Sequence, residues 1–91
     1  MVSIDFLLDY LGVDESSKEI VETLAKTAIA DLGENADAIA AENPDLINEY
    51  IMSAVYLSFY ALRGEEKNTQ YIEQRKNSLA VKLGLRVDDG I

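Results

Sequence analysis

The stretch that decides the fold occupies residues 43–64 and reads NPDLINEYIMSAVYLSFYALRG. Asn43 is a favourable helix N-cap, and Pro44 suits the first helical position because its missing N–H has no partner there. Gly64 is typical of the residue that follows a helix end. The pattern therefore predicts a helix that runs to Arg63, roughly 20 residues and about 30 Å long.

That helix is apolar on almost every side. Its main stripe contains Leu46, Ile47, Tyr50, Ile51, Ala54, Val55, Leu57, Ala61 and Leu62. Met52, Tyr56, Phe59 and Tyr60 spread onto its other faces. A helix that is hydrophobic all round is normally buried all round. We therefore expect it to be the centre of a tight four-helix bundle or to be covered partly by another subunit. The aromatic residues favour the second alternative, since Tyr and Phe are enriched in interface cores.

Four residues near the end of this helix are the candidate interface residues: Tyr56, Phe59, Tyr60 and Arg63. Tyr60 and Arg63 are three residues apart and share one helical face. Arg63 can pair with an acidic residue of a neighbour or stabilise the C-terminus of its own helix. The alternative for the three aromatic residues is an ordinary intrachain core.

Two amphipathic segments precede the long helix. In residues 4–11 the apolar residues recur at helical spacing, with Ser3 as N-cap and Gly12 at the end. In the second segment, Ser16 with Glu19 fits a capping box, and Asp14 is a competing cap. Its apolar stripe, which ends before Gly33, consists of Ile20, Val21, Leu24, Ala28 and Leu32.

The remaining segments complete an all-α pattern. Residues 34–43 are Ala-rich and can form a short helix or an ordered loop. A further helix is expected from about Gln70 to Leu83, ending before Gly84. Its inward residues are expected to be Ile72, Leu79 and Leu83, with Tyr71 extending that face.

No strand pattern occurs. We expect a single domain over residues 1–91, a small bundle of about four helices with a long central apolar third helix, and a flexible tail at 84–91.

Composition narrows the possible functions. The 91 residues include 8 Lys and Arg and 17 Asp and Glu, for a net charge of −9. The chain has no Cys and no His, which excludes thiolate nucleophiles, disulfides, Cys/His zinc sites and imidazole bases. No EF-hand loop or phosphate-binding Gly-rich loop is present. We expect no enzymatic activity, no cofactor, no metal and no catalytic residues. A four-helix carrier or small enzyme is disfavoured by the missing motifs.

The charge is divided unevenly along the chain. Residues 1–50 carry a net charge of −10, and residues 51–91 carry a net charge of +1. The acidic half of one copy can therefore meet the basic end of another, or both halves can be solvated helix faces. The acidity argues against nonspecific nucleic-acid binding. The N-terminus shows no targeting signal and no apolar run is long enough for a membrane span, so we expect a soluble cytoplasmic protein.

Three motifs occur in an order that resembles a known family. They are YLGVD at residues 10–14 after a short helix, YLSFYALRG at 56–64 closing the long helix, and YIEQRKNSL at 71–79. With the acidic capped helix at 16–32 between the first two, this order is similar to the small head–tail connector (DNA-packaging) proteins of tailed bacteriophages. The resemblance covers nearly the whole chain, and the Ala-rich segment 34–43 departs from the usual pattern.

The resemblance implies a structural role in the virion, at the head–tail junction, after assembly in the host cytoplasm. Subunits of this family form a homo-oligomeric ring beneath the portal protein and contact neck or tail completion proteins. DNA passes through the ring without specific binding, and no membrane is involved. Like charge in the acidic half would keep DNA from adhering to the channel. The alternative function is an acidic DNA mimic or regulatory protein that occupies a DNA-binding enzyme.

Overall fold

Helices account for most of the chain in the computed structural model, which describes residues 2–33, 36–64 and 69–84. In those ranges the elements are α1 (Ile4–Leu11), the 3-10 turn η1 (Glu15–Ser17), α2 (Lys18–Asp31), α3 (Ala36–Glu42), α4 (Pro44–Leu62) and α5 (Gln70–Lys82). The described residues contain no strand, which confirms the all-α prediction. The finer expectation of a four-helix bundle is not confirmed, because five α-helices are present in the described ranges.

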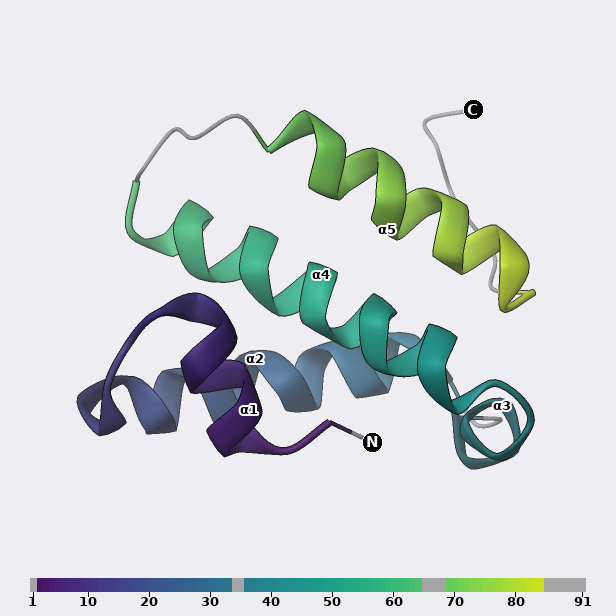
Figure 1. Cartoon of the computed structure of the whole chain (residues 1–91), viewed down its shortest axis with the longest axis horizontal. Coiled ribbons are helices and arrows are strands. Elements are labelled where there is room, and N and C mark those ends of the chain that lie inside the picture. Colours follow the sequence, from purple (N-terminus) through teal and green to yellow (C-terminus); the bar gives the residue numbers. More distant parts are fainter. Residues whose placement is uncertain (1, 34–35, 65–68, 85–91) are drawn as a thin grey trace.

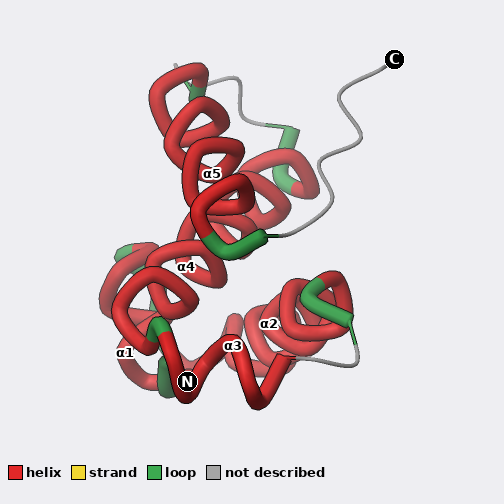
Figure 2. Tube along the Cα trace, turned by 90° about the vertical axis from the view of Figure 1, so that its right-hand side faces the viewer, coloured by secondary structure: helices red, strands yellow, loops and turns green. Residues whose placement is uncertain are grey.

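Helix α4 is the longest element and packs against each of the other α-helices. In Figure 1, α5 lies along one side of α4, α1 and α2 lie along the other, and α3 sits beside the N-terminal end of α4. Figure 2 shows the same arrangement end-on, with α5 above α4 and with α1 and α2 on different sides below it. The position of α4 explains how so apolar a helix can be enclosed.

The first helix begins and ends as predicted. The Ser3 side chain accepts a hydrogen bond from the backbone N–H of Phe6 at 3.1 Å, the usual N-cap interaction. Gly12 ends the helix in the left-handed conformation at φ 72°, which a residue without a Cβ adopts at little cost. The cap and the terminator fix the length of α1.

Two predicted caps are corrected. The Ser16–Glu19 capping box is wrong, and the competing cap Asp14 caps the 3-10 turn η1: its carboxylate accepts from the backbone N–H of Ser16 at 3.0 Å and from the Ser16 hydroxyl. The reason is that a 3-10 turn comes before α2 and uses Ser16 within it. At α4, the Asn43 side chain makes no capping bond; its backbone N–H donates instead to Ile39 O at 2.9 Å, because α4 directly follows the end of α3.

The Ala-rich segment forms the short helix α3, which settles the choice between helix and loop. Two side chains expected to face inward are exposed: Ile20 on α2 and Tyr71 on α5. The buried residues of α2 are Val21, Ala25 and Ala28, and Leu32 at its C-cap is buried as well. Ile20 lies roughly 100° to one side of Val21 at the helical rotation per residue. On α5, the helical rotation per residue likewise places Tyr71 on a different side of the helix from Leu79 and Leu83. Both leucines are buried, as predicted.

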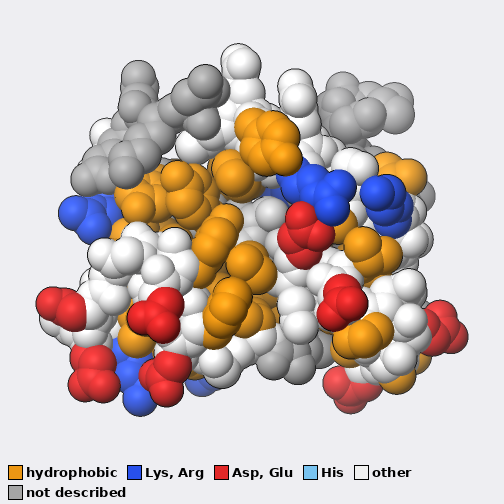
Figure 3. Space-filling view, in the orientation of Figure 1, with side chains coloured by type: hydrophobic (Ala, Val, Ile, Leu, Met, Phe, Trp, Pro, Cys, Tyr) orange, Lys and Arg blue, Asp and Glu red, His pale blue; other side chains and the backbone are white. Residues whose placement is uncertain are grey.

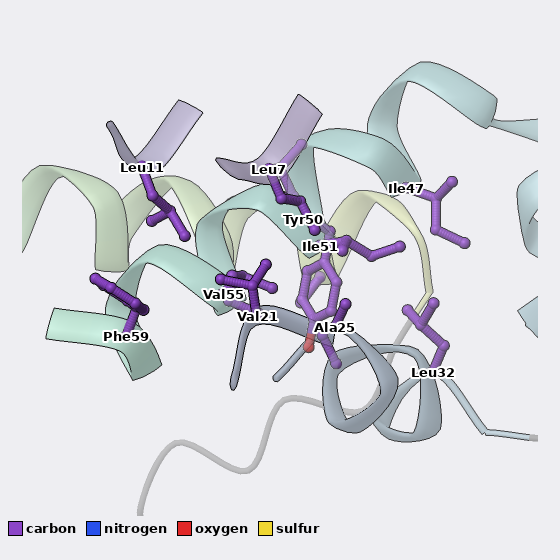
Figure 4. Close-up of a cluster of buried hydrophobic side chains, with 14 of the residues drawn as sticks. Leu7, Leu11, Val21, Ala25, Leu32, Ile47, Tyr50, Ile51, Val55 and Phe59 are labelled. Carbon is purple, nitrogen blue, oxygen red and sulfur yellow. The ribbon is translucent and has the colours of Figure 1, made fainter. Parts of the chain in front are cut away.

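The core lies where α1, α2 and α5 meet α4. Figure 4 shows Leu7 and Leu11 from α1, Val21 and Ala25 from α2, and a row of α4 side chains packed together. The largest side chains with almost no exposure are Leu7, Val21, Ile47, Ile51, Val55 and Leu79. None of the helices in the described ranges is long and apolar enough to cross a membrane. Of the predicted tail at 84–91, residues 85–91 lie outside the described residues.

Candidate interaction surfaces

The aromatic residues near the end of α4 form a cluster within one chain. The Tyr56 ring lies between Tyr10 of α1 and Tyr60, with ring centroids 5.8 and 4.7 Å apart, respectively. Phe59 meets Tyr60 edge-on, with centroids 5.4 Å apart. These spacings and tilted orientations are those that aromatic pairs favour. The structure therefore brings together the three aromatic residues predicted from sequence and adds Tyr10.

This cluster is largely enclosed. Phe59 and Tyr60 are 3% and 9% exposed, and the Tyr60 hydroxyl donates to Leu11 O at 3.2 Å. That hydrogen bond ties α4 to the end of α1. Within one chain these two rings are therefore already buried, which matches the intrachain-core alternative. Whether Tyr56, Phe59, Tyr60 and Arg63 also contribute to an interface stays a prediction.

Arg63 follows α4 directly, at its C-cap position. Its guanidinium carbon lies 5.4 Å from the centroid of the Phe59 ring, within the range of a cation–π interaction. A cation beside the last carbonyl groups also complements the helix dipole. The position matches the helix-end alternative, while pairing of Arg63 with an acidic residue of a neighbour stays a prediction.

The acidic and basic halves of the chain meet where α4 packs on α5. Arg75 Nε donates to Glu49 Oε1 at 2.8 Å, and Arg75 Nη2 donates to Glu49 Oε2 at 2.9 Å. The Arg75 hydrogen bonds lower the pKa of Glu49, and the Glu49 carboxylate raises the pKa of Arg75. Lys76 Nζ lies 5.8 Å from the centroid of the Tyr50 ring. The opposite charges predicted to join two copies are thus partly matched inside one copy.

Five large apolar side chains in the described helices remain exposed. They are Phe6 (49%), Ile20 (51%), Leu62 (70%), Tyr71 (73%) and Val81 (68%). Figure 3 shows hydrophobic side chains in a band across the middle of one face, with acidic side chains mostly below it. Apolar surface that gathers in grooves is typical of a contact site, whereas scattered exposed residues are ordinary.

The first groove, about 260 Å³ in volume, lies between the start of α1 and the N-terminal half of α4 and is called here the α1–α4 groove. Its lining residues are Val2, Ser3, Phe6, Asn48 and Met52. Asn48 Oδ1 is buried and accepts no hydrogen bond from the described residues. A buried acceptor without a donor is unfavourable. The α1–α4 groove is therefore apolar with one unsatisfied polar atom.

The second groove, about 310 Å³ in volume, lies between α2 and the C-terminal end of α4 and is called here the α2–α4 groove. Its lining residues are Glu19, Ile20, Thr23, Leu24 and Leu62. The Thr23 hydroxyl donates to the backbone oxygen of Glu19 at 3.0 Å, within α2. The two grooves lie toward opposite ends of α4.

Sequence reasoning missed both grooves. Phe6 and Ile20, which line the grooves, each lie off the buried stripe of their own helix, and that displacement is the signal that could have identified them. For Asn48 no sequence signal exists, because an asparagine in a helix is ordinary until its surroundings are known. In the described ranges, no group of three or more acidic side chains is placed to hold a metal ion. No protein-family model, curated protein or solved structure matches this chain.

Proposed function

We propose that this chain is a structural head–tail connector subunit that forms a ring beneath a phage portal. The observation that carries the proposal is the presence of two apolar grooves toward opposite ends of α4. A subunit in a closed ring uses two different surfaces, one for each neighbour, because ring contacts are heterologous. The motifs at residues 10–14, 56–64 and 71–79 supply the family resemblance.

Two further features support a structural role over catalysis. The chain has neither Cys nor His, and its polar groove residues are Ser3, Asn48, Thr23 and Glu19 rather than a nucleophile–base pair. The net charge of −10 over residues 1–50 would repel phosphate if that half faced the channel. The partners in this proposal are further copies of the chain, the portal, and a neck or tail completion protein.

The test uses a phage that carries this gene and a matched mutant from which the gene is deleted. Electron microscopy of the mutant should show filled heads without tails, or heads that have lost their DNA. Supplying the intact gene from a plasmid should restore tailed particles, which controls for effects on neighbouring genes. Normal yields of infectious particles from the deletion mutant would overturn the connector function. A purified monomer that inhibits a DNA-binding enzyme would instead support the acidic DNA mimic.

A further inference from the structure

Helix α5 is attached to the rest of the chain mainly near its C-terminal end. Within its 13 residues only Leu79 and Ala80 are buried, and Leu83, its C-cap residue, is buried just beyond them. In the first turn, Ile72 is half-buried and Tyr71 is exposed. Burial of apolar side chains supplies most of the free energy that docks a helix. The N-terminal half of α5 therefore contributes little of it.

The contacts at the N-terminal half of α5 are largely polar. Arg75 binds Glu49 of α4 through two hydrogen bonds, and Lys76 Nζ lies 5.8 Å from the centroid of the Tyr50 ring. Arg75 and Glu49 are both partly exposed, and an ion pair between such side chains adds little stability. The side chain of Thr69, at the N-cap position, makes no capping hydrogen bond with the described residues. These contacts orient α5 on α4 more than they hold it there.

Helices α1, α2 and α4 have a core that does not depend on α5. Leu7 and Leu11 of α1 and Val21 of α2 lie together with Ile51 and Val55 of α4 (Figure 4). Among the described residues α5 packs chiefly against α4, and Figures 1 and 2 show it on the other side of α4 from α1 and α2. Departure of α5 would leave the contacts among α1, α2 and α4 in place. The fold therefore contains two parts that can open with different free energies.

We propose that α5 is a strap that undocks from α4 while helices α1 to α4 remain folded. An isolated helix shorter than about 12–15 residues is marginal in water, so α5 loses its helical structure when it undocks. The opening uncovers the face of α4 that carries Glu49 and, one turn further on, Ser53, which is 4% exposed in the closed state. The chain thus has a second folded state with a different exposed surface. This property is independent of the connector function, because it follows only from how α5 packs.

Residue-resolved hydrogen exchange of the intact chain tests the proposal. Amides of residues 76–82 in α5 should be at least about tenfold less protected than those of residues 51–58 in α4. Below the unfolding transition, protection in α5 should also fall less steeply with urea, because undocking exposes less surface than global unfolding. An equal dependence on urea in the two helices would mean that α5 opens only with the whole chain, and it would overturn the proposal.

Two core variants separate the opening of α5 from global unfolding. Leu7→Ala weakens the core that the open and closed states share, so it should lower protection in α4 by at least about thirtyfold and leave protection in α5 unchanged. Leu79→Ala weakens only the closed state, so it should lower protection in both helices by a similar factor. If Leu7→Ala reduced protection in α5 as much as in α4, α5 would not open separately and the proposal would be rejected.

A milder pair of variants covers the case in which a leucine variant fails to fold. Val21→Ala on α2 should act like Leu7→Ala, and Ala80→Gly on α5 should act like Leu79→Ala, with changes of roughly five- to tenfold. Circular dichroism should show native helix content for both. Equal losses of protection in α4 and α5 for Val21→Ala would again contradict a separate opening.

Discussion

Helices α4 and α5 lie side by side, yet they use their surfaces in opposite ways. Of the 19 residues of α4, eight are buried, whereas α5 has 13 residues and buries only Leu79 and Ala80. The helix that resembled an interface in sequence is enclosed by its own chain, and the helix that resembled an ordinary surface element exposes Tyr71 and Val81. The hydrophobicity of a helix therefore indicates that the helix is covered. Only the fold shows whether its own chain or another molecule provides the cover.

Burial on α4 is sufficient within one chain because four α-helices in the described residues contact it. Burying one large aliphatic or aromatic side chain stabilises a fold by roughly 1.5–3 kcal/mol. The stability of this domain should therefore depend mostly on α4, and the exposed face of α5 should contribute little. Three predictions test this division, beginning with the largest expected effect.

Ile51→Ala should produce the largest loss of stability. Ile51 is fully buried in the middle of α4, and truncation of such a residue typically lowers the free energy of unfolding by about 2–5 kcal/mol. The matched control is Val81→Ala on α5, where the side chain is 68% exposed and the change should stay within about 0.5 kcal/mol. Urea denaturation followed by circular dichroism measures both. Equal losses in the two variants would contradict the contrast between the helices.

Tyr60→Phe should have an intermediate effect. It removes the hydroxyl that donates to Leu11 O across the α1–α4 contact, while the ring keeps its place in the aromatic cluster. Loss of one such hydrogen bond typically lowers the free energy of unfolding by about 0.5–1.5 kcal/mol. Tyr56→Phe is the control, because the Tyr56 hydroxyl donates to no atom in the described part of the chain. If both variants were equally stable, the hydrogen bond would have no measurable role.

Local features of the fold could be predicted from sequence. The boundaries of α1, α4 and α5 follow from residues with one strong local preference, such as Ser3, Pro44 and the terminating Gly64. The caps at Ser16 and Asn43 could not be predicted, because a preceding 3-10 turn or helix already uses those residues. Such competition between neighbouring elements is decided by packing rather than by the preference of one residue.

The candidate surfaces were harder to predict than the helices. The aromatic residues of α4 were correctly recognised as a group, but periodicity alone does not state whether cover comes from α1 or from another molecule. The α1–α4 groove combines residues about 45 positions apart, Phe6 with Asn48 and Met52. Its unsatisfied oxygen depends on the positions of several side chains at once, which a one-dimensional pattern does not contain.

The ion pair between Glu49 and Arg75 should produce the smallest effect, because both side chains are partly exposed and solvent screens them. The paired guanidinium lowers the pKa of Glu49, so the pair stabilises the folded chain above the ordinary carboxyl value of 4.5. That contribution is lost as the pH falls through the lowered pKa. Glu49→Gln and Arg75→Gln should each remove it and flatten the same acidic part of the curve of stability against pH.

Asp14 must be separated from this effect, since hydrogen bonds from the Ser16 hydroxyl and N–H also lower its pKa and add a loss of stability in acid. Melting temperatures measured between pH 3 and pH 7 for the intact chain and both glutamine variants allow the Glu49 contribution to be obtained by subtraction. The expected difference is a few degrees at most and should shrink in concentrated salt. Because this bond joins α4 to a helix that buries only Leu79 and Ala80 within its bounds, a large difference would mean that α5 is held by charge rather than by Leu79 and Leu83.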